Sequence, residues 1–185
     1  MNALWSYFWP VFGAGLVFGA LAGSVGFRVP RMRLKDPPAS DKIVAPGLRR
    51  RRTLALAIGM AASIAIAALW HGPLGAADRF AAQVERSARL TLENNEIPQV
   101  TAHLHHGPLT RRLILAGPAD EFQRSELVRI TGNLPGVSSA RWSAKAGGPP
   151  LIVEGVAVAV LGFLFGLLLA YLVELRRRYN AQWNW

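Results

Sequence analysis

Three long hydrophobic stretches constrain this chain more than any other feature of its sequence. They run from Trp5 to Phe27, from Thr53 to Trp70 and from Leu151 to Leu175. A helix needs about 20 mostly apolar residues to cross the hydrocarbon core of a bilayer, and each stretch is close to that length. The third stretch carries charge only near its ends, at Glu154 and Glu174. The sequence therefore predicts an integral membrane protein with three transmembrane helices.

Clusters of basic residues indicate how these helices are oriented. One cluster ends in the run Arg49, Arg50, Arg51 and Arg52, and a second, of Arg176, Arg177 and Arg178, follows the third stretch directly. Short loops rich in Lys and Arg stay on the cytoplasmic side of a membrane, and one three-span topology satisfies both clusters. We also expect these seven arginines to contact the head groups of anionic phospholipids.

The predicted division of the chain follows from the spans and the charges. It comprises a transmembrane helix in residues 1–28 with its N-terminus outside, a basic cytoplasmic loop in 29–52, a second helix in 53–70, an outer domain with linkers in 71–150, a third helix in 151–175 and a cytoplasmic tail in 176–185. Basic residues follow the first stretch rather than precede it, which is typical of an uncleaved span and not of a signal peptide. Trp5, Tyr7, Trp9 and Trp70 are expected at the outer membrane interface.

The formal net charge of +10 raises the question of nucleic-acid binding. That function requires basic residues on a folded face with an element that reads a groove, whereas the Arg49–Arg52 run adjoins a hydrophobic stretch. We therefore expect no nucleic-acid partner. The chain has no Cys, which excludes disulfide bonds, thiol catalysis and Cys-based zinc sites.

Small residues within the spans recur at the spacing that lets two transmembrane helices approach closely. The candidate packing residues are Gly15, Gly19, Gly23, Gly59, Gly162 and Gly166. Four residues is slightly more than one helical turn, so glycines at this spacing line one face. Two interpretations stay open: the three helices pack on one another through these faces, or at least one face contacts another subunit.

The segment between the second and third spans predicts a small domain with the order helix, strand, strand, helix, strand. The elements are an amphipathic helix that starts near Ala77 and ends near Asn94, a strand from Val100 to His105, a strand from Arg111 to Gly117, a helix that starts near Asp120 with Phe122, Leu127, Ile130 and Leu134 on its buried face, and a short strand from Val137 to Trp142. The whole chain is thus predicted to be α+β.

This element order and two motifs resemble the BON domain. The motifs are Leu113-Ile114-Leu115-Ala116-Gly117-Pro118-Ala119 before the second helix of the domain and Leu134-Pro135-Gly136-Val137 after it, and the resemblance covers about Ala76 to Trp142. The family usually has a tight glycine hairpin between its first two strands, where this sequence has a longer connection from His106 to Thr110. The resemblance implies a bacterial envelope module that binds phospholipid or an envelope partner and has no catalytic residues.

Few residues suggest metal binding or proton transfer. His103, His105 and His106 invite comparison with a metal site, with His71 as a further ligand, but no acidic residue lies close in sequence to complete one. We expect these histidines on an exposed sheet face, with no metal or cofactor bound. Glu154 could carry a proton within the membrane, but its place at the edge of the span favours a solvated interfacial carboxylate.

The sequence therefore predicts a non-enzymatic protein of the bacterial inner membrane, with its N-terminus in the periplasm and its C-terminus in the cytoplasm. A periplasmic BON-like domain would bind phospholipid or an envelope partner. The alternative is an accessory or assembly subunit of a larger membrane complex. The bilayer, with its anionic phospholipids, is one expected partner, and a membrane or envelope protein or a second copy of the chain is left open as another.

Overall fold

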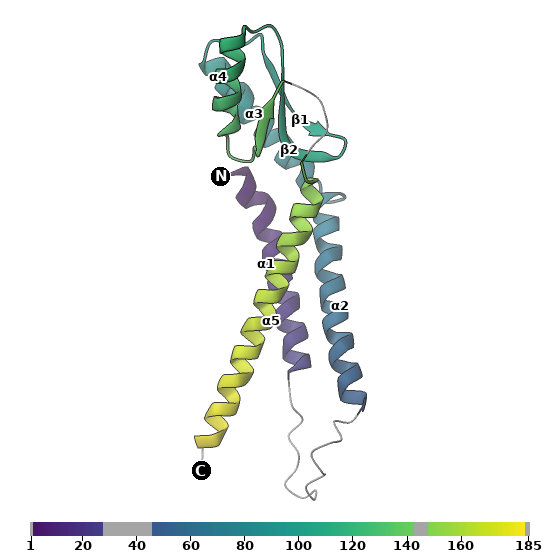
Figure 1. Ribbon diagram of the computed structural model, residues 1–185. Helices are drawn as coiled ribbons and strands as arrows, with labels where there is room; N and C mark the ends of the chain where they lie inside the picture. The colour runs from purple at the N-terminus through teal and green to yellow at the C-terminus, as the bar shows by residue number, and fades with distance from the viewer. Residues whose placement is uncertain (1, 28–45, 143–147, 184–185) are drawn as a thin grey trace, which may run out of the picture. The chain divides into compact units, whose positions relative to one another are not determined.

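The computed structural model describes residues 2–27, 46–142 and 148–183, and is a mixed α+β structure (Figure 1). Its elements are α1 (Ala3–Gly26), α2 (Pro46–His71), α3 (Ala76–Asn94), β1 (Thr101–His106), β2 (Leu109–Ala116), α4 (Glu121–Gly132), β3 (Ser139–Arg141) and α5 (Leu151–Trp183). The predicted α+β class and the predicted order of helices and strands are confirmed.

Three of the helices are long and apolar enough to cross a membrane, as the sequence predicted. The candidate spans are Ala3–Gly26, Arg49–His71 and Leu151–Ala181. Two of these helices extend further than the hydrophobic stretches do. Pro46 lies in the first turn of α2, where backbone N–H groups have no partner within the helix, so a proline is tolerated there. Residues 46–52 are therefore helical rather than part of a loop. Similarly, α5 continues to Trp183 through the predicted tail.

The described chain divides into two compact units. The first, called here the α/β unit, comprises Met1–Pro10 and Ala67–Ala157, and the second, the helical unit, comprises Val11–Ile66 and Val158–Trp185. Helices α1, α2 and α5 contribute residues to both units. The sequence predicted a domain within 71–150 alone, so the ends of the long helices are additions to it.

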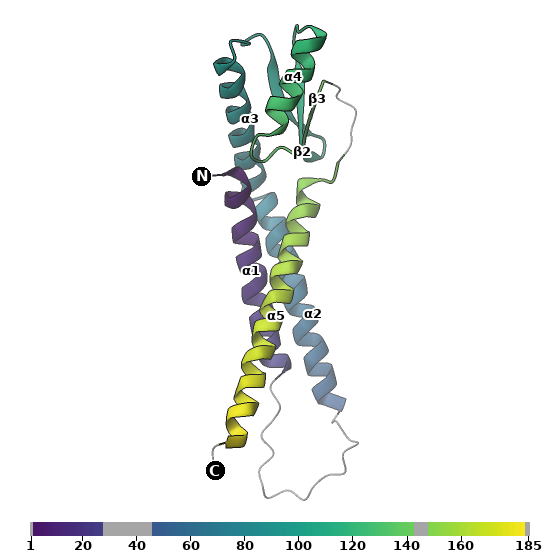
Figure 2. The same ribbon diagram turned by 60° about the vertical axis from the view of Figure 1, so that its left-hand side comes forward.

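A three-stranded sheet with the order β1-β2-β3 organises the α/β unit. Strands β1 and β2 are antiparallel, and β2 and β3 are parallel, with α4 as the crossover between them (Figure 2). The register places Leu104 opposite Leu113 and Leu113 opposite Ala140, so these buried residues share one face of the sheet. Helices α3 and α4 pack against that face, and their buried side chains complete a single core.

The start of α4 agrees with its predicted helix signal. The Asp120 carboxylate accepts a hydrogen bond from the backbone N–H of Gln123 at 2.7 Å, and the Gln123 side chain accepts one from the Asp120 N–H at 3.2 Å. This reciprocal capping box satisfies two otherwise unpaired donors at the helix start. The predicted buried face was wrong at Phe122, which is 78% exposed; Leu127 and Thr131, one turn apart, are the buried positions.

The connection between β1 and β2 is shorter than predicted. His106 pairs with Leu109, so Gly107 and Pro108 alone form the turn, and β2 begins before Arg111. The expectation of a longer connection from His106 to Thr110 was therefore wrong. A small irregularity in register between Leu104 and His106 accommodates the turn.

Candidate functional site

The core of the α/β unit includes the first turns of α1, which centre on Tyr7. Tyr7 is 2% exposed, its hydroxyl shares a 2.7 Å hydrogen bond with Nδ1 of His71, and its ring lies 5.6 Å from that of Phe80. Trp70 donates from Nε1 to the Tyr7 carbonyl at 3.0 Å. Residues Tyr7, Trp70 and Phe80 come from three different helices, so this contact joins segments distant in sequence.

Tyr7 was predicted to share the outer membrane interface with Trp5 and Trp9, but its side chain is buried in the protein, because the helix turns it away from these tryptophans. Trp5 and Trp9 are four residues apart, share one face and stack at 5.2 Å between ring centroids, with more than half of each residue exposed. Tyr7 lies on the opposite face. The spacing of Trp5, Tyr7 and Trp9 already indicated this difference, since residues two apart on a helix face nearly opposite ways.

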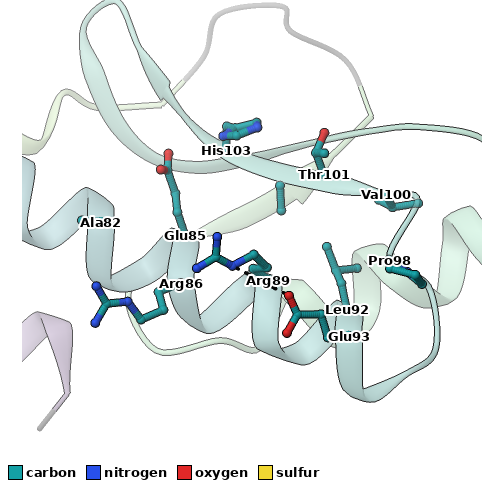
Figure 3. Close-up of a pocket in the computed structure, with 11 residues that line it drawn as sticks. Ala82, Glu85, Arg86, Arg89, Leu92, Glu93, Pro98, Val100, Thr101 and His103 are labelled. Atoms are coloured by element: carbon teal, nitrogen blue, oxygen red, sulfur yellow. Dashed lines mark ion pairs between the residues drawn. The ribbon is translucent and has the colours of Figure 1, made fainter.

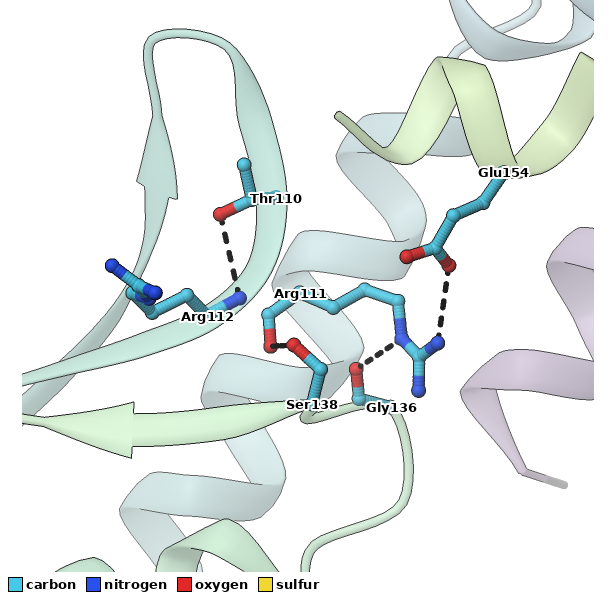
Figure 4. A network of polar contacts seen from close by, with 6 residues as sticks. All are labelled: Thr110, Arg111, Arg112, Gly136, Ser138 and Glu154. Carbon is cyan, nitrogen blue, oxygen red and sulfur yellow. Dashed lines mark hydrogen bonds and ion pairs between the residues drawn. The ribbon is translucent and has the colours of Figure 1, made fainter. Parts of the chain in front are cut away.

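A polar network connects the start of α5 to the sheet (Figure 4). The Arg111 guanidinium donates from Nη1 to Glu154 Oε2 at 3.0 Å and from Nε to the Gly136 carbonyl at 3.1 Å. Each side chain of the ion pair is 22% exposed. The Arg111 carbonyl also accepts hydrogen bonds from the N–H and hydroxyl of Ser138. Glu154 is thus a partly buried carboxylate that is paired with Arg111, whereas the sequence predicted a solvated one.

A groove of about 460 Å³ lies between α3 and β1 (Figure 3). Arg86, Arg89 and Glu93 line it from α3, and Val100, Ala102 and His103 line it from the strand side. Arg89 and Glu93 form a loose pair at 3.9 Å, with both side chains exposed. Arg86 has no ion-pair partner within residues 2–27, 46–142 and 148–183. The sequence patterns gave no sign of this groove, which forms only when the helix packs beside the strand.

Glu85 contacts the outer edge of β1 at one end of the groove. Its Oε1 accepts a 2.9 Å hydrogen bond from the Leu104 backbone N–H and a 3.2 Å hydrogen bond from His106 Nε2. The Leu104 N–H therefore points away from β2. Residues two apart on an antiparallel strand direct their backbone groups to the same side, so Ala102 also directs its N–H and carbonyl away from β2.

The four histidines do not gather at one place. His103 is exposed on the sheet, His105 donates from Nδ1 to the Pro108 carbonyl at 3.1 Å, His106 contacts Glu85, and His71 contacts Tyr7. Across the part of the chain that the structure describes, no group of three or more His, Asp or Glu side chains has the arrangement of a metal site.

The predicted packing glycines lie at close helix contacts of the helical unit. A Cβ atom on Gly15 or Gly19 would overlap the backbone carbonyl of Ala159 or Phe163 on α5, and one on Gly162 or Gly166 would overlap that of Phe12 or Leu16 on α1. Gly59 lies against Ala22 and Phe163, and Gly23 lies against Ala170. The two pairs on α1 and α5 therefore face each other reciprocally, with backbone against backbone.

The predicted lipid-contact arginines lie on helices. Arg49, Arg50, Arg51, Arg176, Arg177 and Arg178 are exposed, and Arg52 is half-buried. Arg178 contacts Glu174 at 3.4 Å and donates from Nη2 to the Phe27 carbonyl at 3.3 Å. The runs occupy the first turns of α2 and the last turns of α5, so both are attached rigidly to a candidate span.

Comparison with protein-family models, with curated proteins and with solved structures found no match for this chain. The resemblance to BON domains therefore rests on the two sequence motifs and the order of elements, and the functional argument rests on the geometry described above.

Proposed function

We propose that this protein is a non-enzymatic protein of the bacterial inner membrane that presents its α/β unit as a binding module in the periplasm. Helices α1, α2 and α5 cross the membrane, the N-terminus is periplasmic, and the C-terminus is cytoplasmic. The module binds phospholipid or an envelope partner, as its resemblance to BON domains implies.

The observation that carries this proposal is the position of the two arginine runs on the long apolar helices. Arg49–Arg52 precede the apolar part of α2, and Arg176–Arg178 follow that of α5. Long cationic side chains at the end of a membrane helix extend to the head-group layer and favour the cytoplasmic side. In a three-span topology the segment from His71 to Pro150 then falls on the opposite side.

Cysteine labelling tests this topology directly, because the chain has no native Cys. Ser125, exposed on α4, and Asn180, exposed on α5, are each replaced by Cys in separate variants. A membrane-impermeant maleimide applied to intact spheroplasts should label the Ser125→Cys protein at once and the Asn180→Cys protein only after permeabilisation. The reverse pattern contradicts the proposed orientation.

Mass spectrometry of what co-purifies in a mild detergent tests the binding role. We expect anionic phospholipid to be retained by the wild type, and its retention to fall when the seven arginines of the two runs are replaced by Gln. Replacement of Arg124, Arg129 and Arg141, which belong to the α/β unit, provides a control for loss of charge alone. Equal lipid retention by all three proteins would exclude the arginine runs as lipid contacts.

The second function that the sequence suggested, an accessory subunit of a larger membrane complex, makes a different prediction for the same purification. A stoichiometric protein partner would support it. Within the helical unit the six predicted packing glycines contact other helices of the same chain, so this structure offers no specific observation in favour of a partner helix at those faces.

A further inference from the structure

We propose that the groove between α3 and β1 binds an extended, acidic segment of a partner protein, which adds to the free edge of β1 as a further strand. The inference rests on the proposed function, because it identifies the class of envelope partner that the binding module recognises. It is argued from the backbone groups at the strand edge, from the charges along the groove and from the size of the opening.

The strand edge supplies the backbone contacts. β1 is at one end of the sheet order, so no strand among the described residues pairs with its outer side. The Ala102 N–H and carbonyl point toward that side, and Ala102 lines the groove. An exposed strand edge of this kind is a template for an incoming extended peptide. Glu85, which accepts the Leu104 N–H, limits the open edge at the other end.

The charges along α3 define the chemistry of the peptide. Arg86 and Arg89 are exposed and lie one turn apart on the side of α3 that lines the groove. Of the two carboxylates in the groove, Glu85 is already engaged by Leu104 and His106, and Glu93 is a loose partner of Arg89 at 3.9 Å. Figure 3 shows the Arg89 side chain between those of Glu85 and Glu93. An incoming carboxylate would add charge-assisted hydrogen bonds to these guanidinium groups.

The dimensions fit a short segment and not a folded domain. The opening of about 460 Å³ is in the size range of sites for small ligands. A strand advances about 3.3 Å per residue, so the stretch from Val100 to Ala102 accommodates only a few residues of a partner strand. Specificity then comes from the side chains that alternate toward α3, of which one carries the carboxylate.

The test uses the full chain in detergent and a set of synthetic peptides. The peptides alternate Val and Thr and differ at one internal position, which is Asp, Ser or Lys, and an Asp peptide with a methylated backbone nitrogen cannot donate at the paired position. We expect the wild type to bind the Asp peptide more tightly than the Ser or Lys peptide and to lose affinity for the N-methylated one. The Arg86→Gln/Arg89→Gln variant should bind the Asp peptide at least about tenfold more weakly.

Two further variants distinguish peptide binding at the strand edge from the effects of a general loss of charge or of folding. Ala102→Pro removes the N–H at the free edge without removing a bond to β2, so it should weaken binding of every peptide while the circular dichroism spectrum stays unchanged. Arg124→Gln/Arg129→Gln, on the other helix, should bind as the wild type does. Should Ala102→Pro fail to fold, the Arg86→Gln/Arg89→Gln result decides.

The inference is overturned if the Asp peptide binds no better than the Lys peptide, or if Arg86→Gln/Arg89→Gln binds it as tightly as the wild type. It is also overturned if the peptides do not bind and the same variant instead loses its co-purifying anionic phospholipid, because the groove is then a lipid site. Labelling at Ser125 is independent of these results. A failed peptide test with the expected labelling therefore removes only this inference, whereas an inverted labelling pattern removes the proposed topology.

Discussion

At the scale of single residues, two polar contacts connect the ends of long helices to the rest of the α/β unit. The Arg111–Glu154 ion pair joins α5 to the sheet, and the Tyr7–His71 hydrogen bond joins α1 to α2. Each pair links residues far apart in sequence and is partly buried. In such places the loss of one partner leaves the other partly buried and without that contact, which is more costly than the loss of an exposed contact.

Replacement of Glu154 by Gln tests the first contact. It leaves the Arg111 guanidinium, 22% exposed, without its counter-charge, and we expect destabilisation by about 1–3 kcal/mol, measured as a lower thermal unfolding temperature in detergent. Glu126→Gln is the matched control, because it breaks an ion pair with Arg129 that lies in solvent and is screened. Equal shifts in unfolding temperature for the two variants would show that the Arg111–Glu154 pair stabilises the protein no more than an exposed ion pair does.

Replacement of Tyr7 by Phe tests the second contact. The change keeps the buried ring and deletes the hydroxyl that bonds to His71, so we expect a loss of about 1–2 kcal/mol in stability. Tyr171→Phe removes a hydroxyl from an exposed side chain and should change the unfolding temperature little. An unfolding temperature for Tyr7→Phe equal to that of the wild type would mean that the hydrogen bond contributes nothing measurable.

At the scale of elements, the contact between α1 and α5 depends on reciprocal glycines. Gly15 and Gly19 lie against the backbone of α5, and Gly162 and Gly166 lie against that of α1. Because lipid tails are as apolar as Leu side chains, such helices associate through close packing and not through burial from water. The glycines are therefore required for their lack of a side chain, since a Cβ atom would meet backbone that cannot move aside.

Gly166→Ala tests this packing, with Gly13→Ala as its control. The new methyl group at position 166 would collide with the Leu16 carbonyl and force the helices apart, and we expect a loss of about 1–3 kcal/mol. At position 13 there is no atom within 4 Å of the added methyl group, so the better helix propensity of Ala should leave stability unchanged or raised. Thermal unfolding in detergent distinguishes these opposite signs.

At the scale of the whole molecule, the distribution of charge should determine orientation in the membrane. If Arg49, Arg50, Arg51 and Arg52 are all replaced by Gln, only the run on α5 continues to favour one topology. We expect a fraction of the Ser125→Cys molecules then to escape labelling by an impermeant reagent, because part of the population inserts inverted. Replacement of Arg86, Arg89, Arg124 and Arg129 removes as many charges from the α/β unit and should leave labelling complete.

Local sequence patterns determined much of this protein. Apolar length predicted the three long helices, alternation predicted β1, and the acidic residues Asp120 and Glu121 marked the start of α4. These signals are carried by residues near one another in the chain. The helix ends were less predictable, because Arg49–Arg52 and Arg176–Arg178 are good helix formers that extend a helix beyond its apolar part.

Only the tertiary structure decided which side chains meet. Tyr7 became a core residue because α1 turns it toward Phe80 and His71, and Glu154 became partly buried and paired because Arg111 lies across from it. Phe122 is exposed, although the sequence pattern placed it on the same buried face as Leu127. The groove beside Ala102 likewise exists only once α3 packs next to an edge strand. Periodicity specifies the faces of an element, but which face is covered depends on elements far away in the sequence.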